Sequence, residues 1–179
     1  MDFYIQAGTP RSSHERDESD HSLDEAIESA FPLRTEYAYL VWQGVHIPLG
    51  YKYDLSVMSA DLMEIVEKLL SSSEGRHEIH WASNSFASIW LLKWFGDELK
   101  IESTWSQVIG GTESILSERS NICVGRLEFV REWREVFGKL LGGLDDAGYD
   151  ENSIPEMAKM RFLFQTIDRS GSLYYIDPV

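Results

Sequence analysis

The longest periodic pattern in the chain is helical and lies in its C-terminal half. Apolar residues recur there at steps of three and four positions: Leu127, Val130, Trp133, Phe137, Leu140, Leu141 and Leu144. This spacing predicts a helix over residues 126–147, and Gly148 can supply the left-handed residue that commonly ends a helix. Three glycines lie inside or near the end of this pattern, as packing positions or as positions that loosen the helix: Gly138, Gly142 and Gly143.

Three shorter segments also predict helices. Ser59 can begin a helix that extends to about Leu70, because the apolar residues between them share one face. Capping boxes, in which a serine and a glutamate three residues later satisfy free backbone N–H groups, begin two more helices at Ser22 and Ser153. The first of these is expected to end before Pro32.

Alternation with period two predicts β-strands in the remaining segments. The expected strands are residues 2–6, 37–42, 45–53, 77–83, 86–95 and 99–105, with further short strands at 122–124 and 173–176. A tight turn at Gln43 and Gly44 makes the second and third a hairpin, and the next three form a meander. The fold class is therefore α+β: a mostly antiparallel sheet of about five to seven strands packed with three to four helices. We expect one domain over residues 1–179.

The strand predicted at 86–95 is apolar on both faces, so both faces are expected to need cover. Trp90 and Trp94 lie on one face, and Ile89 and Leu91 lie on the other. Because tryptophan concentrates at the anchoring points of protein interfaces, Trp90 and Trp94 are candidate partner-binding residues. The alternative is that helices and the long loop predicted at 107–121 cover the strand and that every indole belongs to the core.

Composition narrows the classes of partner. The 179 residues include 16 Lys and Arg against 30 Asp and Glu, a formal net charge of −14. Nucleic-acid binding and adsorption to anionic membranes both need cationic surface, so neither is expected. The charge favours a basic protein partner instead. Residues 8–21 are polar and predict a mobile acidic loop.

The sequence also bears on the compartment. Residues after Met1 contain neither a basic and apolar leader nor a run long enough to span a bilayer. Cys123 is the single cysteine and has apolar neighbours, which predicts a buried, reduced thiol. We therefore expect a cytoplasmic protein.

A search for catalytic and cofactor motifs finds none. No glycine-rich phosphate loop, GxSxG nucleophile elbow or HExxH zinc motif occurs in the chain. His77 and His80 are separated by an odd number of positions, so on a strand their side chains point to opposite faces and share no metal. We expect no catalytic residue, no cofactor and no metal, although a triad assembled in space from distant segments stays possible.

Acidic residues gather where the long predicted helix ends: Asp145, Asp146, Asp150 and Glu151. Their spacing does not fit a calcium-binding EF-hand, because Ala147 and Tyr149 stand at ligand positions. Unpaired carboxylates near a helix C-terminus are unfavourable with the helix dipole, which points to a cation or a basic partner. These four residues are the second set of candidate partner-binding residues, and a solvated turn is the alternative.

Two stretches resemble the immunity proteins that bacteria carry against polymorphic or contact-dependent toxins: Tyr51-Lys52-Tyr53-Asp54-Leu55-Ser56 and Leu127-Glu128-Phe129-Val130-Arg131-Glu132-Trp133. The resemblance implies a cytoplasmic inhibitor that binds one cognate toxin domain, often a basic nuclease, and blocks its active site. The charge, the aromatic residues and the absence of catalytic motifs favour a binding protein without catalytic activity. Acidic surface would then speed association with such a partner.

Two other hypotheses stay open. The protein could be a structural subunit of a larger assembly, including a homodimer formed through the meander. It could also be an enzyme or small-molecule-binding domain with a pocket lined by Trp90, Trp94, Tyr51 and Tyr53, in which carboxylates act as acid and base.

Overall fold

The computed structural model of the chain describes residues 2–167. The strands are β1 (Phe3–Gln6), β2 (Ala38–Trp42), β3 (Val45–Leu49), β4 (Glu74–Ala82), β5 (Phe86–Phe95), β6 (Glu98–Val108) and β7 (Asn121–Gly125). The α-helices are α1 (Leu23–Ala30), α2 (Ser56–Ser71), α3 (Glu113–Glu118), α4 (Arg126–Ala147) and α5 (Glu156–Thr166), and a π-helical turn, η1 (Tyr51–Leu55), precedes α2. The strand predicted at 173–176 lies outside the described residues.

The described strands form two antiparallel sheets, with the orders β1-β2-β3 and β4-β5-β6-β7. The predicted α+β class is confirmed, as are the hairpin (β2 and β3) and the meander (β4 to β6). The prediction of one sheet is wrong, because the hairpin pairs with β1 whereas the meander pairs with β7. Helix α3 also lies inside the segment predicted as a loop at 107–121.

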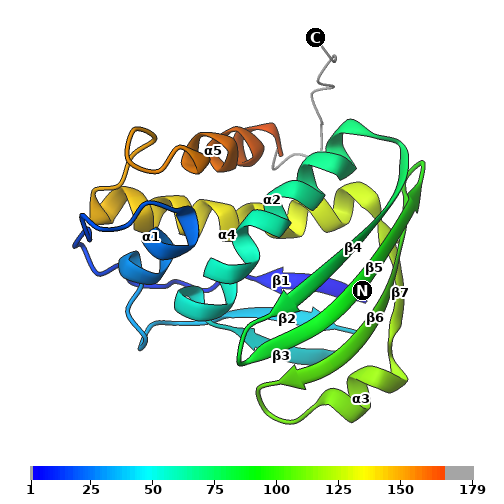
Figure 1. The fold of residues 1–179 in the computed structure, drawn as a ribbon. Coiled ribbons are helices and arrows are strands. Elements are labelled where there is room, and N and C mark those ends of the chain that lie inside the picture. The colour runs from blue at the N-terminus through cyan, green and yellow to red at the C-terminus, as the bar shows by residue number, and fades with distance from the viewer. Residues whose placement is uncertain (1, 168–179) are drawn as a thin grey trace.

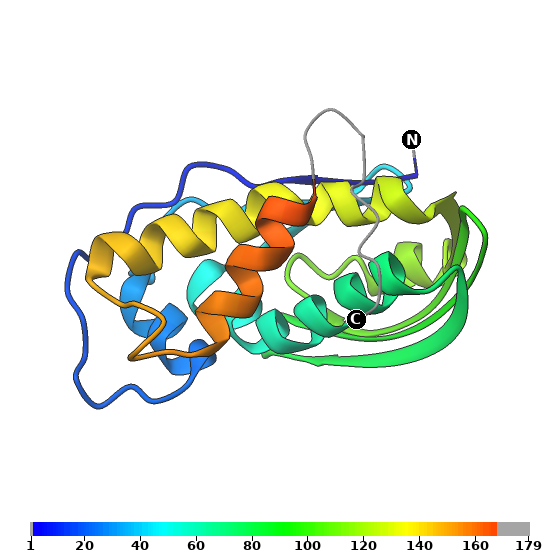
Figure 2. The same cartoon turned by 90° about the horizontal axis from the view of Figure 1, so that it is seen from above.

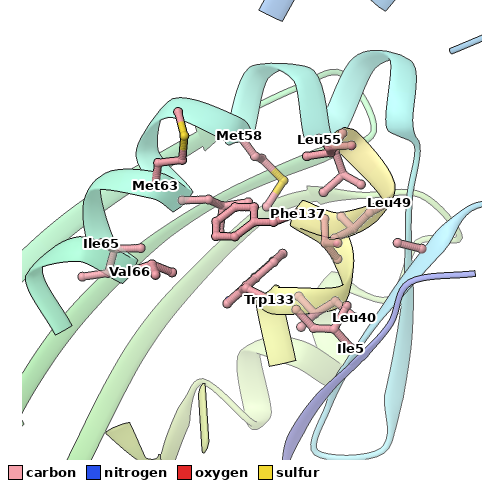
Figure 3. Packing of buried hydrophobic residues seen from close by; sticks show 14 of the residues in the cluster. Ile5, Leu40, Leu49, Leu55, Met58, Met63, Ile65, Val66, Trp133 and Phe137 are labelled. Carbon is pink, nitrogen blue, oxygen red and sulfur yellow. The ribbon is translucent and has the colours of Figure 1, made fainter. Parts of the chain in front are cut away.

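Helices α2, α4 and α5 gather on one side of the sheets, whereas α3 lies apart from them at the far end of the large sheet (Figure 1). Figure 1 shows α2 and α4 above the strands, and Figure 2 shows α5 crossing over both helices. Figure 3 shows α2 residues Met58 and Val66 facing Trp133 and Phe137 of α4. Within residues 2–167, none of the helices combines the length and the apolar character that crossing a membrane requires.

One aromatic cluster joins the two sheets. Trp42 of β2 lies 5.3 Å from Trp90 of β5 and 5.2 Å from Trp105 of β6, measured between ring centroids. Phe3 of β1 stacks on Phe129 of α4 at 4.8 Å. All five side chains are buried, so residues of both sheets and of α4 share a single core.

The prediction that both faces of β5 are covered is wrong. Trp90 and the alternate residues on its face are buried, whereas Ile89 is 39% exposed and Phe95 is 77% exposed on the other face. The neighbours on that face explain why it stays open. Leu91, for example, lies between Glu78 of β4 and Glu102 of β6 in the strand register, and such charged rows favour solvent.

The second strand of the hairpin ends earlier than predicted. It stops at Leu49 instead of Tyr53, because the carbonyl oxygen of Gly50 accepts hydrogen bonds from the backbone N–H groups of Asp54 and Leu55 and turns the chain into η1. Helix α2 then begins at Ser56, three residues before the predicted start.

Two further predictions concern the loop and the cysteine. Residues 8–21 form no helix or strand, and this loop is attached to the end of α4, where the backbone N–H of Asp17 donates to the Tyr149 hydroxyl at 3.0 Å. Its mobility stays a prediction. The prediction of a buried thiol at Cys123 is wrong: β7 is an edge strand, and Cys123 lies on its exposed face.

Candidate protein-binding groove

An open depression of about 500 Å³ lies where four segments of the chain meet. Strand β1 contributes Phe3, preceded by Asp2, and the turn between β5 and β6 contributes Asp97 and Glu98. The remaining lining residues are Cys123, Val124 and Gly125 of β7 and Glu128 in the first turn of α4. We call this depression the acidic groove.

A tight turn and hydrogen bonds to backbone atoms join the β5–β6 turn to the start of α4. Gly96 adopts a φ of +59°, which favours glycine, and so allows the tight turn between β5 and β6. The carbonyl oxygen of Asp97 in this turn accepts the backbone N–H of Arg126 at 2.7 Å, which joins the turn to the start of α4. The Arg126 side chain donates to backbone carbonyl oxygens of Gly96 (2.8 Å) and Ser72 (2.9 Å). Its Nε and Nη1 groups are therefore used on the backbone, and Arg126 is not among the residues that line the groove.

The electrostatics of the acidic groove are one-sided. Four of its lining residues are carboxylates: Asp2, Asp97, Glu98 and Glu128. Among the described residues only Glu98 forms an ion pair, with Lys100 Nζ at 3.0 Å, and this contact raises the pKa of Lys100. Among residues 2–167, no Lys, Arg or His lines the groove. The groove therefore presents more negative charge than the protein itself neutralises.

The carboxylate of Glu132 lies one helical turn beyond Glu128. Its Oε2 accepts the backbone N–H of Ile5 at 2.7 Å. Burial raises the pKa of the Glu132 carboxyl, and the charge of Glu128 raises it further, although the hydrogen bond from Ile5 opposes both effects. The negative charge of Glu128 therefore acts on the half-buried carboxyl group of Glu132, and a cation bound in the groove would offset this effect.

This arrangement suits recognition of cationic side chains. Exposed carboxylates accept hydrogen bonds from Lys and Arg, and an open depression admits a protein surface. Within residues 2–167, no three side chains of His, Cys, Asp or Glu are placed so that they could hold a metal ion.

Trp90 and Trp94, predicted as interface anchors, lie inside the protein, so the structure contradicts their surface role. Trp90 is fully buried within the aromatic cluster. Trp94 is 6% exposed, and its Nε1 donates to the carbonyl oxygen of Ser72 at 3.2 Å. Its ring covers Gly75, where a Cβ atom would lie 2.2 Å from Trp94 Cζ2. Both indoles face the core because residues on one side of β5 point toward the helices. For these two residues, this is the core position that the sequence analysis gave as the alternative.

The acidic residues around the C-terminal end of α4 are not an unpaired cluster. Arg161 of α5 donates to Asp145 Oδ1 at 2.8 Å and to Glu151 Oε1 at 3.1 Å. Asp150 accepts backbone N–H groups in the turn before α5, chiefly that of Ser153, and these bonds lower its pKa.

The fourth member, Asp146, accepts the Ser12 hydroxyl at 3.5 Å. All four residues therefore have partners within the protein. They also lie toward the opposite end of helix α4 from Glu128: Asp145 and Asp146 are about 26 Å away along the helix axis, at about 1.5 Å per residue. The structure does not bring them to the acidic groove.

The groove residues were not predicted as a site from the sequence. The only local signal was the turn at Gly96, Asp97 and Glu98, which separates two strands. Glu128 joins it because β7, which leads into α4, pairs with β6. Asp2 joins it because β1 packs against α4, where Phe3 contacts Phe129 and Ile5 donates to Glu132. No spacing within either segment indicates these contacts.

The pocket proposed in the small-molecule hypothesis exists in part. Tyr51 and Tyr53 line a cavity of about 110 Å³ together with Asp54, whereas Trp90 and Trp94 do not line it. This cavity lies beside η1, away from the acidic groove.

Comparisons of the chain with protein-family models, with curated proteins and with solved structures find no match.

Proposed function

We propose that this protein is a non-catalytic binding protein that neutralises a basic protein partner, and that the acidic groove is its contact site. The observation that carries the proposal is the lining of the groove by the residues that the structure describes: four carboxylates, a single ion pair at Glu98, and no cationic side chain. A partner that inserts Lys or Arg side chains would supply the missing positive charge.

The resemblance of two sequence stretches to immunity proteins supports a more specific role. In that role the partner is a bacterial toxin domain with a basic active-site surface, and this protein covers that surface in the cytoplasm. The net charge of −14 supports the same role, because it would attract a cationic domain from a distance. The acidic groove would then fix the position of the bound partner.

The first step of the test is affinity capture of the tagged full chain from cells that produce it, followed by mass spectrometry. The proposal expects one stoichiometric basic protein whose toxicity is relieved when this chain is produced with it. Recovery of the chain alone, while the partner is known to be expressed, would contradict the proposal and favour self-association.

The second step compares two variants that lose the same charge at opposite ends of α4. The groove variant carries Asp97→Asn, Glu98→Gln and Glu128→Gln. At low ionic strength its association rate should fall by about tenfold, because electrostatic steering depends on charges close to the contact. The difference should shrink in physiological salt, where the Debye length is about 8 Å.

The matched control variant carries Asp145→Asn, Asp146→Asn and Glu151→Gln. It should associate with the captured partner at nearly the wild-type rate. Equal slowing of both variants would show that only the total charge matters, and it would remove the acidic groove from the proposal.

A further inference from the structure

A second cavity lies at the other end of β5 from the acidic groove. Ser85, which immediately precedes β5, lines it, whereas Asp97 of the groove follows β5. The ten residues of β5 separate the two sites by about 30 Å, at about 3.4 Å per residue. The cavity measures about 110 Å³, and it shares no lining residue with the groove. Its role can therefore be tested independently of the proposed function.

The carboxylate of Asp54 is buried in the wall of this cavity. The residue is only 3% exposed. Its Oδ1 accepts the hydroxyl groups of Ser83 and Ser85, the latter at 2.6 Å, and its Oδ2 accepts the backbone N–H of Gly50 at 2.7 Å. Among the described residues these three neutral groups are its hydrogen-bond partners, and no cation pairs with it. Buried carboxylates are usually paired with a cation, so Asp54 lacks its expected counter-charge.

The Oδ2 atom retains capacity for another donor. A carboxylate offers about four lone-pair positions, two on each oxygen, and Oδ2 of Asp54 uses one of its two. A Cβ atom at Gly50 would lie 3.3 Å from this oxygen and 3.1 Å from Tyr37 Cε1. A Cβ atom there would therefore crowd both the carboxylate and the Tyr37 ring, and glycine lets these two groups lie close to the backbone.

The backbone does not require glycine at this position. Gly50 has a φ of −75° and a ψ of 134°, which other residues adopt freely. What the glycine provides is the absence of a Cβ atom that would crowd Asp54 Oδ2 and the Tyr37 ring.

Aromatic rings form the outer part of the cavity. Tyr37 is 39% exposed and Tyr53 is 47% exposed, so both rings are accessible from solvent. The faces of tyrosine rings attract cations. Lys52 illustrates this here, since its Nζ lies 5.5 Å from the centroid of the Tyr53 ring. Lys52 also lines the cavity, and its ammonium donates to the carbonyl oxygen of Glu28 at 2.5 Å. Among the described residues it forms no ion pair with Asp54.

We propose that this cavity binds an organic cation that carries an N–H donor: a primary ammonium or a guanidinium group. The free lone pair of Asp54 would accept one N–H bond, and the tyrosine rings would contact the rest of the cation. A volume of about 110 Å³ corresponds to roughly four water molecules, which suits the end of a Lys or Arg side chain or a small free amine. Both sources present the same chemistry to Asp54.

The test is a titration of the isotope-labelled full chain, followed through its backbone amide NMR signals. The probes are methylguanidinium chloride and propylammonium chloride, with sodium chloride as the ionic-strength control. We expect saturable shifts with millimolar affinity, confined to Tyr37, residues 50–54 and Ser85. Tetramethylammonium, which has no N–H donor, should bind at least several-fold more weakly. Shifts that only follow the sodium chloride control would overturn the proposal.

Two pairs of variants separate binding from folding. Gly50→Ala places a methyl group against Asp54 Oδ2 and the Tyr37 ring without a change of charge, and it should weaken binding by about tenfold or more. Gly142→Ala is its control, because a Cβ atom there meets nothing within 4 Å. Asp54→Asn should also abolish binding, with exposed Asp146→Asn as its control. The dispersion of the amide signals reports whether each variant folds. Equal affinity in folded Gly50→Ala and Gly142→Ala would overturn the proposal, whatever Asp54→Asn does.

A final arm distinguishes the two sources of the cation. Short peptides that carry a single central Arg or Lys and no other charge replace the free probes. Saturable shifts at the same residues would assign the cavity to a polypeptide side chain. Binding of the free cations alone would assign it to a small molecule.

Discussion

Gly142 and Gly143 are neighbours in α4, but only Gly143 faces the core. A Cβ atom at Gly143 would lie 2.2 Å from Cζ of Phe31, the residue that follows α1. The Phe31 ring in turn stacks on Tyr51 at 4.9 Å, so it cannot move away freely. A Cβ atom at Gly142 would meet nothing within 4 Å. The absence of one atom at Gly143 thus allows α1 and α4 to pack closely.

Alanine substitutions at these two positions should have opposite effects on stability. Gly142→Ala should raise the free energy of unfolding by about 0.5–1 kcal/mol, because glycine inside a helix costs backbone entropy. Gly143→Ala should lower it by about 1–3 kcal/mol, because the added methyl group overlaps the Phe31 ring. Urea denaturation of the two variants provides the measurement. A stabilising Gly143→Ala would mean that Phe31 has room to move.

At the scale of elements, α4 shows what the sequence can predict well. Its observed bounds, Arg126–Ala147, agree with the predicted helix, because seven apolar residues set the period and Gly148 ends it in the left-handed region at a φ of +90°. The meander strands were predicted for the same reason: local periodicity and turn residues determine them together.

The π-helical turn η1 shows where local pattern fails. Tyr51 and Tyr53 continue the alternation of β3, so the sequence favours a longer strand. Hydrogen bonds from Ser83 and Ser85, about 30 positions away, hold Asp54 and stabilise the turn instead. The acidic groove was missed for the same reason, since its carboxylates come from three separate segments. Residues that only tertiary pairing brings together leave no periodic signal.

The loop formed by residues 8–21 leads to a prediction at the same scale. The Tyr149 hydroxyl accepts the backbone N–H of Asp17 at 3.0 Å and donates to the Asp20 carboxylate. Tyr149→Phe removes both bonds, so the loop should detach more often and stability should fall by about 1–2 kcal/mol. Trypsin should then cleave after Arg11 and Arg16 several-fold faster. Tyr53→Phe, at an exposed ring, is the control and should leave cleavage unchanged.

Alkaline pH should release the same loop in the wild-type protein. Burial, followed by the hydrogen bond to Asp20, raises the pKa of Tyr149 above the ordinary value of 10.0. The folded state therefore favours the neutral phenol, and the stability that this preference contributes is complete below that value. It is lost as pH rises from the ordinary pKa toward the raised one. Tyr149→Phe should lack this loss, and equal alkaline release in both proteins would assign it to another group.

At the scale of the whole molecule, the aromatic cluster makes the two sheets depend on each other. Trp42 belongs to the small sheet, and Trp90 and Trp105 belong to the large one, yet their rings contact each other directly. Phe3 and Phe129 extend the contact to α4. All six tryptophans of the chain are buried, so tryptophan fluorescence reports on this shared core.

The shared core predicts a single cooperative unfolding transition, as expected of one domain. Tryptophan fluorescence and far-ultraviolet circular dichroism should give coincident curves in urea, and acrylamide should quench the native fluorescence weakly. Trp90→Ala should lower the free energy of unfolding by about 3–5 kcal/mol, because it leaves a large cavity between the sheets. Hydrogen exchange should then quicken together in β2 and in β5. Faster exchange in β5 while β2 keeps its wild-type protection would show that the sheets unfold separately and that the chain holds two cooperative units.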